Sequence, residues 1–135
     1  MIKLSKEKPY EDACKILGLR PVANYKSYKL TDETRNFIKL ETVAKALNEG
    51  WKPTTIDPKE VRCYVWGWNY TDNRKPSGLL DVLSCNGLGY ATAYVGTSLE
   101  FKDEDTAKEF ARMCKPMIVK YLFGRDDHEN FKFDF

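Results

Sequence analysis

The chain has 135 residues, a net charge of +2, 42% apolar residues and 13% aromatic residues. This length fits one domain that buries about two-thirds of its unfolded surface, and the composition excludes a disordered chain. No apolar run approaches the ~18 residues of a membrane span, and residues 1–8 lack the apolar core of a signal peptide. We therefore expect an intracellular domain that has no membrane partner.

Two helices are predicted in the N-terminal half. Residues 9–17 place apolar side chains at spacings of three and four, and Gly18 suits the end of this helix. A second helix begins at Thr31 or Asp32 and reaches about Asn48. Its apolar stripe consists of Phe37, Leu40, Ala44 and Leu47.

From Val61 onward the apolar pattern changes from helical to alternating, which is typical of strands. The predicted strands are Val61–Tyr70, Leu79–Cys85, Gly89–Val95 and a short Ser98–Phe101. The dipeptide Asn86-Gly87 favours a tight hairpin, because both residues tolerate positive φ. Short connections between consecutive strands predict an antiparallel meander.

A last helix is predicted from the cap Asp103 to about Phe123, kinked by Pro116. Residues 125–135 follow as a charged and aromatic tail. The expected fold class is α+β: a three- to four-stranded antiparallel meander packed against two N-terminal helices and one long kinked C-terminal helix. Residues 1–124 form the single domain in this prediction.

The strongest candidate binding feature is an aromatic strand face, whose members are Tyr64, Trp66, Trp68 and Tyr70. Such rings can stack nucleic-acid bases. Basic residues that could then contact phosphates are Arg62, Arg74 and Lys75. Two other interpretations stay open: the face packs under the helices as core, which the sizes of the rings favour, or it forms a protein interface. The pI of about 8.3 is low for a nucleic-acid binder.

The tail carries a second candidate, the alternating residues Phe131, Phe133 and Phe135. This alternation indicates a short strand with one apolar side. It can pair with the sheet edge of its own chain, add to the edge of a partner protein, or be a frayed terminus.

Catalytic and metal-binding signatures are weak. The cysteines at positions 14, 63, 85 and 114 lack the paired spacing of a zinc site, and buried reduced thiols are expected. Asp126, Asp127, His128 and Glu129 are interpreted as a solvated acidic turn. No hydrolase, metalloprotease or phosphate-loop motif is present. We expect no enzyme, cofactor or metal, although a carboxylate-only enzyme built on Asp81 and another acid stays open.

Several segments together resemble a group of small uncharacterised proteins from phages and mobile elements of Bacteroides-type gut bacteria. They include Tyr10-Glu11-Asp12-Ala13-Cys14, Ala46-Leu47-Asn48-Glu49-Gly50-Trp51-Lys52-Pro53 and Val95-Gly96-Thr97-Ser98-Leu99-Glu100-Phe101-Lys102. The chain departs from the group at Val65, where many relatives have Pro before the Trp, and its tail is longer and more aromatic. The resemblance implies a phage protein in the cytoplasm of a bacterial host, or in the virion, and carries over no catalytic residues.

The expected function is a non-catalytic binding or structural module that contacts a phage or host protein or associates with itself. The alternative is a single-stranded nucleic-acid-binding protein that uses Tyr64, Trp66 and Trp68.

Overall fold

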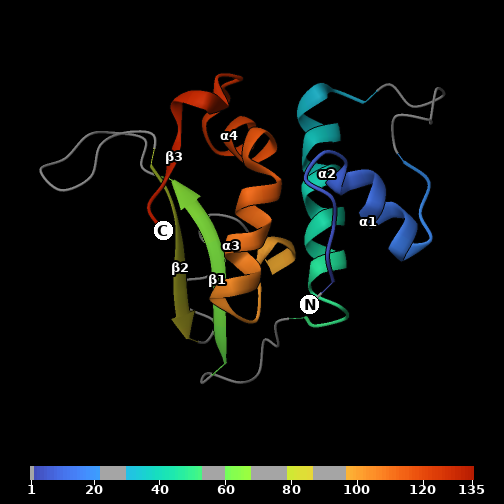
Figure 1. The fold of residues 1–135 in the computed structure, drawn as a ribbon, viewed down its shortest axis with the longest axis horizontal. Helices are drawn as coiled ribbons and strands as arrows, with labels where there is room; N and C mark the ends of the chain where they lie inside the picture. Colours follow the sequence, from blue (N-terminus) through green and yellow to red (C-terminus); the bar gives the residue numbers. More distant parts are fainter. Residues whose placement is uncertain (1, 22–29, 53–59, 68–78, 87–96) are drawn as a thin grey trace, which may run out of the picture.

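The computed structural model describes residues 2–21, 30–52, 60–67, 79–86 and 97–135 (Figure 1). The described part is α+β, as predicted, with four α-helices and a three-stranded sheet. The helices are α1 (Pro9–Leu17), α2 (Asp32–Leu47), α3 (Glu104–Met113) and α4 (Lys115–Phe123). The strands are β1 (Val61–Gly67), β2 (Leu79–Asn86) and β3 (Lys132–Phe133), and the short 3-10 turns are η3 (Thr97–Leu99) and η4 (His128–Asn130).

Both N-terminal helices have the predicted bounds, and local interactions explain why. Gly18 ends α1 in the left-handed conformation at φ 68°, where a residue with a Cβ would be strained. Thr31 caps α2, since its hydroxyl oxygen accepts a hydrogen bond from the Thr34 N–H at 3.1 Å.

The sheet has the order β1-β2-β3. Strands β1 and β2 are antiparallel, with Tyr64 opposite Leu83 and Trp66 opposite Asp81. Strand β3 comes from the tail and runs parallel to β2. An antiparallel meander is therefore not confirmed, and the predicted strand Gly89–Val95 lies outside the described residues.

The predicted strand Ser98–Phe101 is not formed. Residues 97–99 form the η3 turn, and Phe101 makes a single antiparallel bridge to Cys63, with N–H to O distances of 2.8 and 2.7 Å. The physical reason lies just downstream, where the Asp103 side chain caps α3 by accepting a hydrogen bond from the Thr106 N–H at 2.7 Å. The chain thus turns into the helix before a longer ladder can form.

The expected long kinked helix is instead two helices, α3 and α4, separated at Cys114, where φ is −111° and ψ is 20°. Pro116 causes the break, because it has no N–H to donate to the Arg112 carbonyl and its ring crowds that turn. Pro116 consequently lies in the first turn of α4, where proline is well tolerated.

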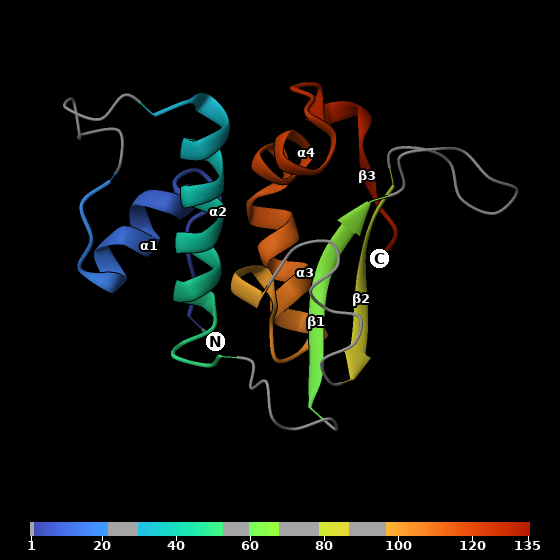
Figure 2. The ribbon, with the colours of Figure 1, turned by 180° about the vertical axis from the view of Figure 1, so that it is seen from behind.

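The elements are arranged as successive layers, and both views show the same order (Figures 1 and 2). Helix α1 packs on α2, α2 packs on α4, and α3 packs on β1 and β2. The core between these layers includes fully buried Leu40, Val43, Leu80, Phe101 and Val119.

Candidate functional site

The two faces of β1 have different surroundings. Val65 lines a small apolar cavity with residues of α2, α3 and α4, among them Leu40 and Phe110. A Cβ placed on Gly67 would overlap the Phe123 ring, coming within 2.7 Å of its Cε2 atom. Since strand residues alternate, Cys63, Val65 and Gly67 face the helices, and Arg62, Tyr64 and Trp66 point the other way.

The aromatic face of β1 therefore does not pack under the helices, although Tyr64 belongs to the buried core and Trp66 packs against it. The helices cover the small residues of β1, because Gly67 lets the Phe123 ring approach the strand closely. Tyr64 is nevertheless only 3% exposed, and Trp66 is half-buried against the core. The remaining predicted members of this site, Trp68, Tyr70, Arg74 and Lys75, lie outside the described residues.

The charged side chain of Arg62 is not exposed to solvent. Its side chain is fully buried, and its Nη1 lies 3.8 Å from Oε2 of Glu100, which is also fully buried. The Asn48 side-chain amide donates to the Glu100 carbonyl at 2.9 Å and ties this segment to the end of α2. Burial raises the pKa of Glu100, and the positive charge of Arg62 only partly offsets this. Glu100 could not be predicted as the partner of Arg62, because the two residues are far apart in the sequence and no local pattern links them.

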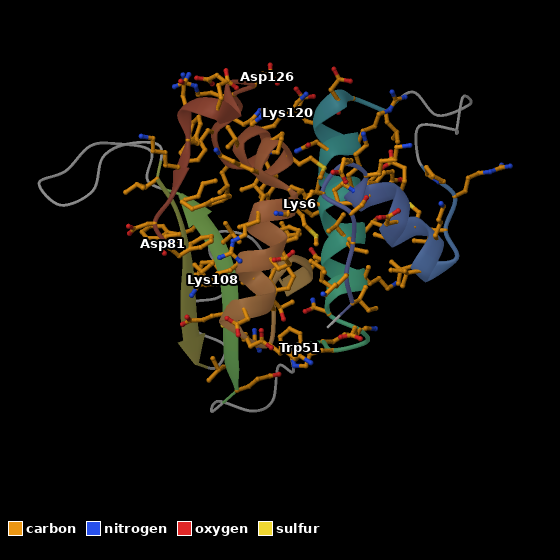
Figure 3. The ribbon with its side chains drawn as sticks, viewed as in Figure 1. Lys6, Trp51, Asp81, Lys108, Lys120 and Asp126 are labelled. Atoms are coloured by element: carbon orange, nitrogen blue, oxygen red, sulfur yellow. The ribbon has the colours of Figure 1, made fainter. Side chains whose placement is uncertain are left out.

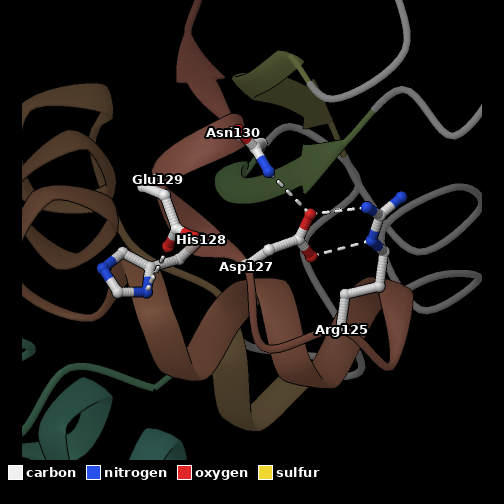
Figure 4. A network of polar contacts seen from close by, with 5 residues as sticks. All are labelled: Arg125, Asp127, His128, Glu129 and Asn130. Atoms are coloured by element: carbon white, nitrogen blue, oxygen red, sulfur yellow. Dashed lines mark hydrogen bonds and ion pairs between the residues drawn. The ribbon is translucent and has the colours of Figure 1, made fainter.

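The second predicted group, the tail phenylalanines, is brought together by the structure. Beyond Gly124, which ends α4 with φ 65°, a polar turn reverses the chain (Figure 4). Asp127 accepts two hydrogen bonds from the Arg125 guanidinium, at 2.8 and 2.5 Å, and one from the Asn130 amide at 2.9 Å. The bonds from Arg125, followed by the bond from Asn130, lower the pKa of Asp127 to about 2. Asp127 therefore stays ionised and keeps the turn closed at neutral pH.

The turn places the tail beside the edge of β2 that does not pair with β1. Leu79 pairs with Lys132 and Leu80 with Phe133, and the Asp134 N–H donates to the Leu80 carbonyl at 2.8 Å. The next N–H on this edge, that of Val82, donates to the Asp81 carboxylate at 2.8 Å. That N–H is not available to the tail, so β3 stays short.

All three tail rings have partners on the body of the protein. Phe131 is 4% exposed and packs on Phe123, with ring centroids 4.7 Å apart. Phe133 and Phe135 stack on each other at 4.9 Å with an interplanar angle of 28°. Of the three alternatives predicted for the tail, the structure has the first: the tail pairs with the sheet edge of its own chain. Residues 125–135 thus pack on the domain that precedes them.

Basic side chains lie over these rings. The Lys115 ammonium is 5.5 Å from the centre of the Phe133 ring, and the Arg112 guanidinium carbon is 5.2 Å from that of Phe135. Lys108 is 5.8 Å from the same Phe135 ring, and Figure 3 shows it on α3, on the sheet side of the molecule. Each such contact adds about 0.5–1 kcal/mol at an exposed site.

We call the surface that receives the tail the docking surface, defined by Leu79, Leu80, Lys108, Arg112, Lys115 and Phe123. Its basic residues were not among the predicted site residues. The available signal was the spacing of four between Lys108 and Arg112, which places both on one face of a helix.

Other chemistry is sparse in the described part of the chain. No group of three or more metal-ligating side chains occurs among these residues, and no helix in the described ranges is long and apolar enough to cross a membrane. Cys14, Cys63 and Cys114 are buried free thiols. Burial raises the pKa of Cys114 to about 12, so this thiol is protonated at neutral pH and is not a nucleophile.

Comparison with known proteins adds no assignment. No family model, no curated protein and no solved structure matches this chain. The resemblance to the phage and mobile-element group therefore stays a prediction.

Proposed function

We propose that this protein is a non-catalytic binding module whose docking surface takes up an extended peptide segment beside β2. The observation that carries the proposal is the tail itself. It pairs with β2 through Leu79 and Leu80 and inserts alternate aromatic rings beneath basic side chains. Strand addition of this kind is a recurrent mode of peptide recognition, in which backbone bonds supply affinity and alternate side chains supply specificity.

The chemistry of the docking surface indicates what kind of peptide fits. Phe123 and Leu80 offer apolar contact at one end, and Lys115, Arg112 and Lys108 offer positive charge at the other. The matching ligand is an extended segment with an aromatic side chain at every second position, because the faces of these rings attract cations. A partner protein would present such a segment and displace the tail.

A phage protein acting in the bacterial cytoplasm or in the virion is part of this proposal, and it rests on the resemblance alone. Single-stranded nucleic-acid binding by Tyr64, Trp66 and Trp68 has less support. Base stacking needs exposed rings, and Tyr64 is 3% exposed while Arg62 is fully buried.

The proposal is tested with a fluorescently labelled synthetic peptide of residues 125–135 as the probe. It is titrated into the natural chain and into the double variant Phe133→Ser, Phe135→Ser. In the natural chain the tethered tail competes at an effective concentration on the order of millimolar. We therefore expect at least about tenfold tighter binding to the variant, followed by fluorescence anisotropy.

The matched control is the same peptide with all three of its phenylalanines, Phe131, Phe133 and Phe135, changed to serine, which should not bind. Circular dichroism establishes that the variant is folded, and the single variant Phe135→Ser replaces it otherwise, because Phe135 is 38% exposed. Failure of the peptide to bind a folded variant, or equal binding of both peptides, contradicts the proposal.

A further inference from the structure

We infer that the occupant of the docking surface in an assembly is the tail of a second copy of this chain, so that two copies exchange residues 131–135. The inference rests on the proposed function and names its partner. Every contact that holds the tail in its own chain is available to the same tail arriving from another molecule. These contacts are the ladder to β2, the packing of Phe131 on Phe123, and the cations over Phe133 and Phe135.

The short ladder makes release of the tail feasible. β3 spans only Lys132 and Phe133, and the pairing extends by one further bond, from the Asp134 N–H to the Leu80 carbonyl. Most of the contacts between the tail and the docking surface are therefore made by side chains. A tail from a second copy would form the same backbone and side-chain contacts, so exchange costs no contact on the docking surface.

The segment that must open is residues 124–130. Its closing contacts lie near solvent: the Arg125 side chain is 59% exposed and that of Asp127 is 26% exposed. Fully extended, these residues reach roughly 23–25 Å at 3.3–3.6 Å each, which sets how far the tail can extend from the end of α4. The bidentate contact of Asp127 with Arg125 favours the closed turn, so it opposes exchange.

The net charge of the tail is opposite in sign to that of the basic residues of the docking surface. The tail carries four acidic residues, Asp126, Asp127, Glu129 and Asp134, and two basic ones, Arg125 and Lys132. The docking surface contributes Lys108, Arg112 and Lys115, of which Lys108 also pairs with Glu104 and Arg112 with Glu109, each at 3.7 Å. The chain thus carries both halves of a complementary pair.

The first measurement is the mass in solution by light scattering over a range of protein concentrations. The variant Asp127→Ala removes the closing contact, and Asp126→Ala is its matched control at the adjacent position. We expect a dimer of twice 15.7 kDa to form at a concentration at least about tenfold lower for Asp127→Ala than for the control.

The second measurement mixes two complementary variants. One carries Phe133→Ser and Phe135→Ser, which damage the tail; the other carries Arg112→Glu and Lys115→Glu, which damage the docking surface. The mixture retains one intact tail and one intact surface, so native mass spectrometry should find the mixed dimer and neither pure dimer.

Monomers at every concentration for Asp127→Ala, together with no mixed dimer, overturn the inference. A dimer that persists in the tail-damaged variant also overturns it, because that dimer would use another surface. Binding of the 125–135 peptide without any dimer leaves the proposed function standing and removes only the second copy as partner.

Discussion

Replacing Phe131 by alanine should destabilise the whole domain, although the residue belongs to the last part of the chain. Its ring is 4% exposed and packs on Phe123 at 4.7 Å, and the Phe123 ring in turn lies against Gly67 of β1. The Phe131 ring thus links the tail to α4 and, through Phe123, to the sheet. The substitution Phe131→Ala removes this buried ring and leaves a space that neighbouring side chains can only partly fill.

The expected loss for Phe131→Ala is about 4 kcal/mol of unfolding free energy, from the 3–5 kcal/mol range for buried Phe to Ala changes. Phe135 is 38% exposed, so Phe135→Ala should lose only about 1–2 kcal/mol, the transfer contribution of a partly buried ring. With a urea slope of about 2 kcal/mol per molar, the midpoints fall by about 2 M and 0.5–1 M.

The assay is urea unfolding followed by far-ultraviolet circular dichroism, with the slope fitted separately for each variant. Phe135→Ala is the matched control, since it changes the same residue type in the same tail, two residues beyond the end of β3. If the two midpoints lie within about 0.3 M of each other, Phe131 is not anchored in the core and the tail is not part of the folded domain.

Three further perturbations test other parts of the structure. Gly67→Ala should cost about 1–3 kcal/mol in urea unfolding, because its Cβ overlaps the Phe123 ring; an unchanged midpoint would mean that this face of β1 does not meet α4. Burial raises the pKa of Glu100, so its stabilising contribution is complete below its unfolded pKa and is lost as pH rises through the folded value. Glu100→Gln should therefore become more stable relative to the natural chain as the pH rises above 4.5, the ordinary pKa of this carboxyl, and a pH-independent difference would contradict the burial effect. Asp103→Ala should cost about 0.5–2 kcal/mol by removing the cap of α3, whereas Asp105→Ala, which leaves the cap intact, should cost less in the same assay.

The helices at the N-terminus could be predicted closely because local interactions set their bounds. Thr31 caps α2 through a residue three positions away, and Gly18 ends α1 through its own backbone conformation. The break between α3 and α4 at Cys114 was harder to predict, because the apolar stripe of the two helices continues across it. Pro116 signalled a disturbance, but whether a helix bends or separates depends on the packing of both halves.

Only the aromatic residues of the candidate site could be predicted from the sequence. Alternation of Phe131, Phe133 and Phe135 predicts a one-sided strand, and the structure places all three rings against the body of the protein. The basic residues above them could not be assigned, because Lys108, Arg112 and Lys115 are ordinary surface cations until the tail returns to meet them.

By itself the sequence determined the α+β class, the positions of α1 and α2, and the two strands that pair as β1 and β2. Tertiary structure alone decided which side of β1 meets the helices and which edge, in which direction, receives the tail. The reason is physical: caps and periodicity act over a few residues, whereas parallel pairing of β3 with β2 depends on where α4 ends in space. The burial of Arg62 beside Glu100 likewise joins residues that only folding brings together.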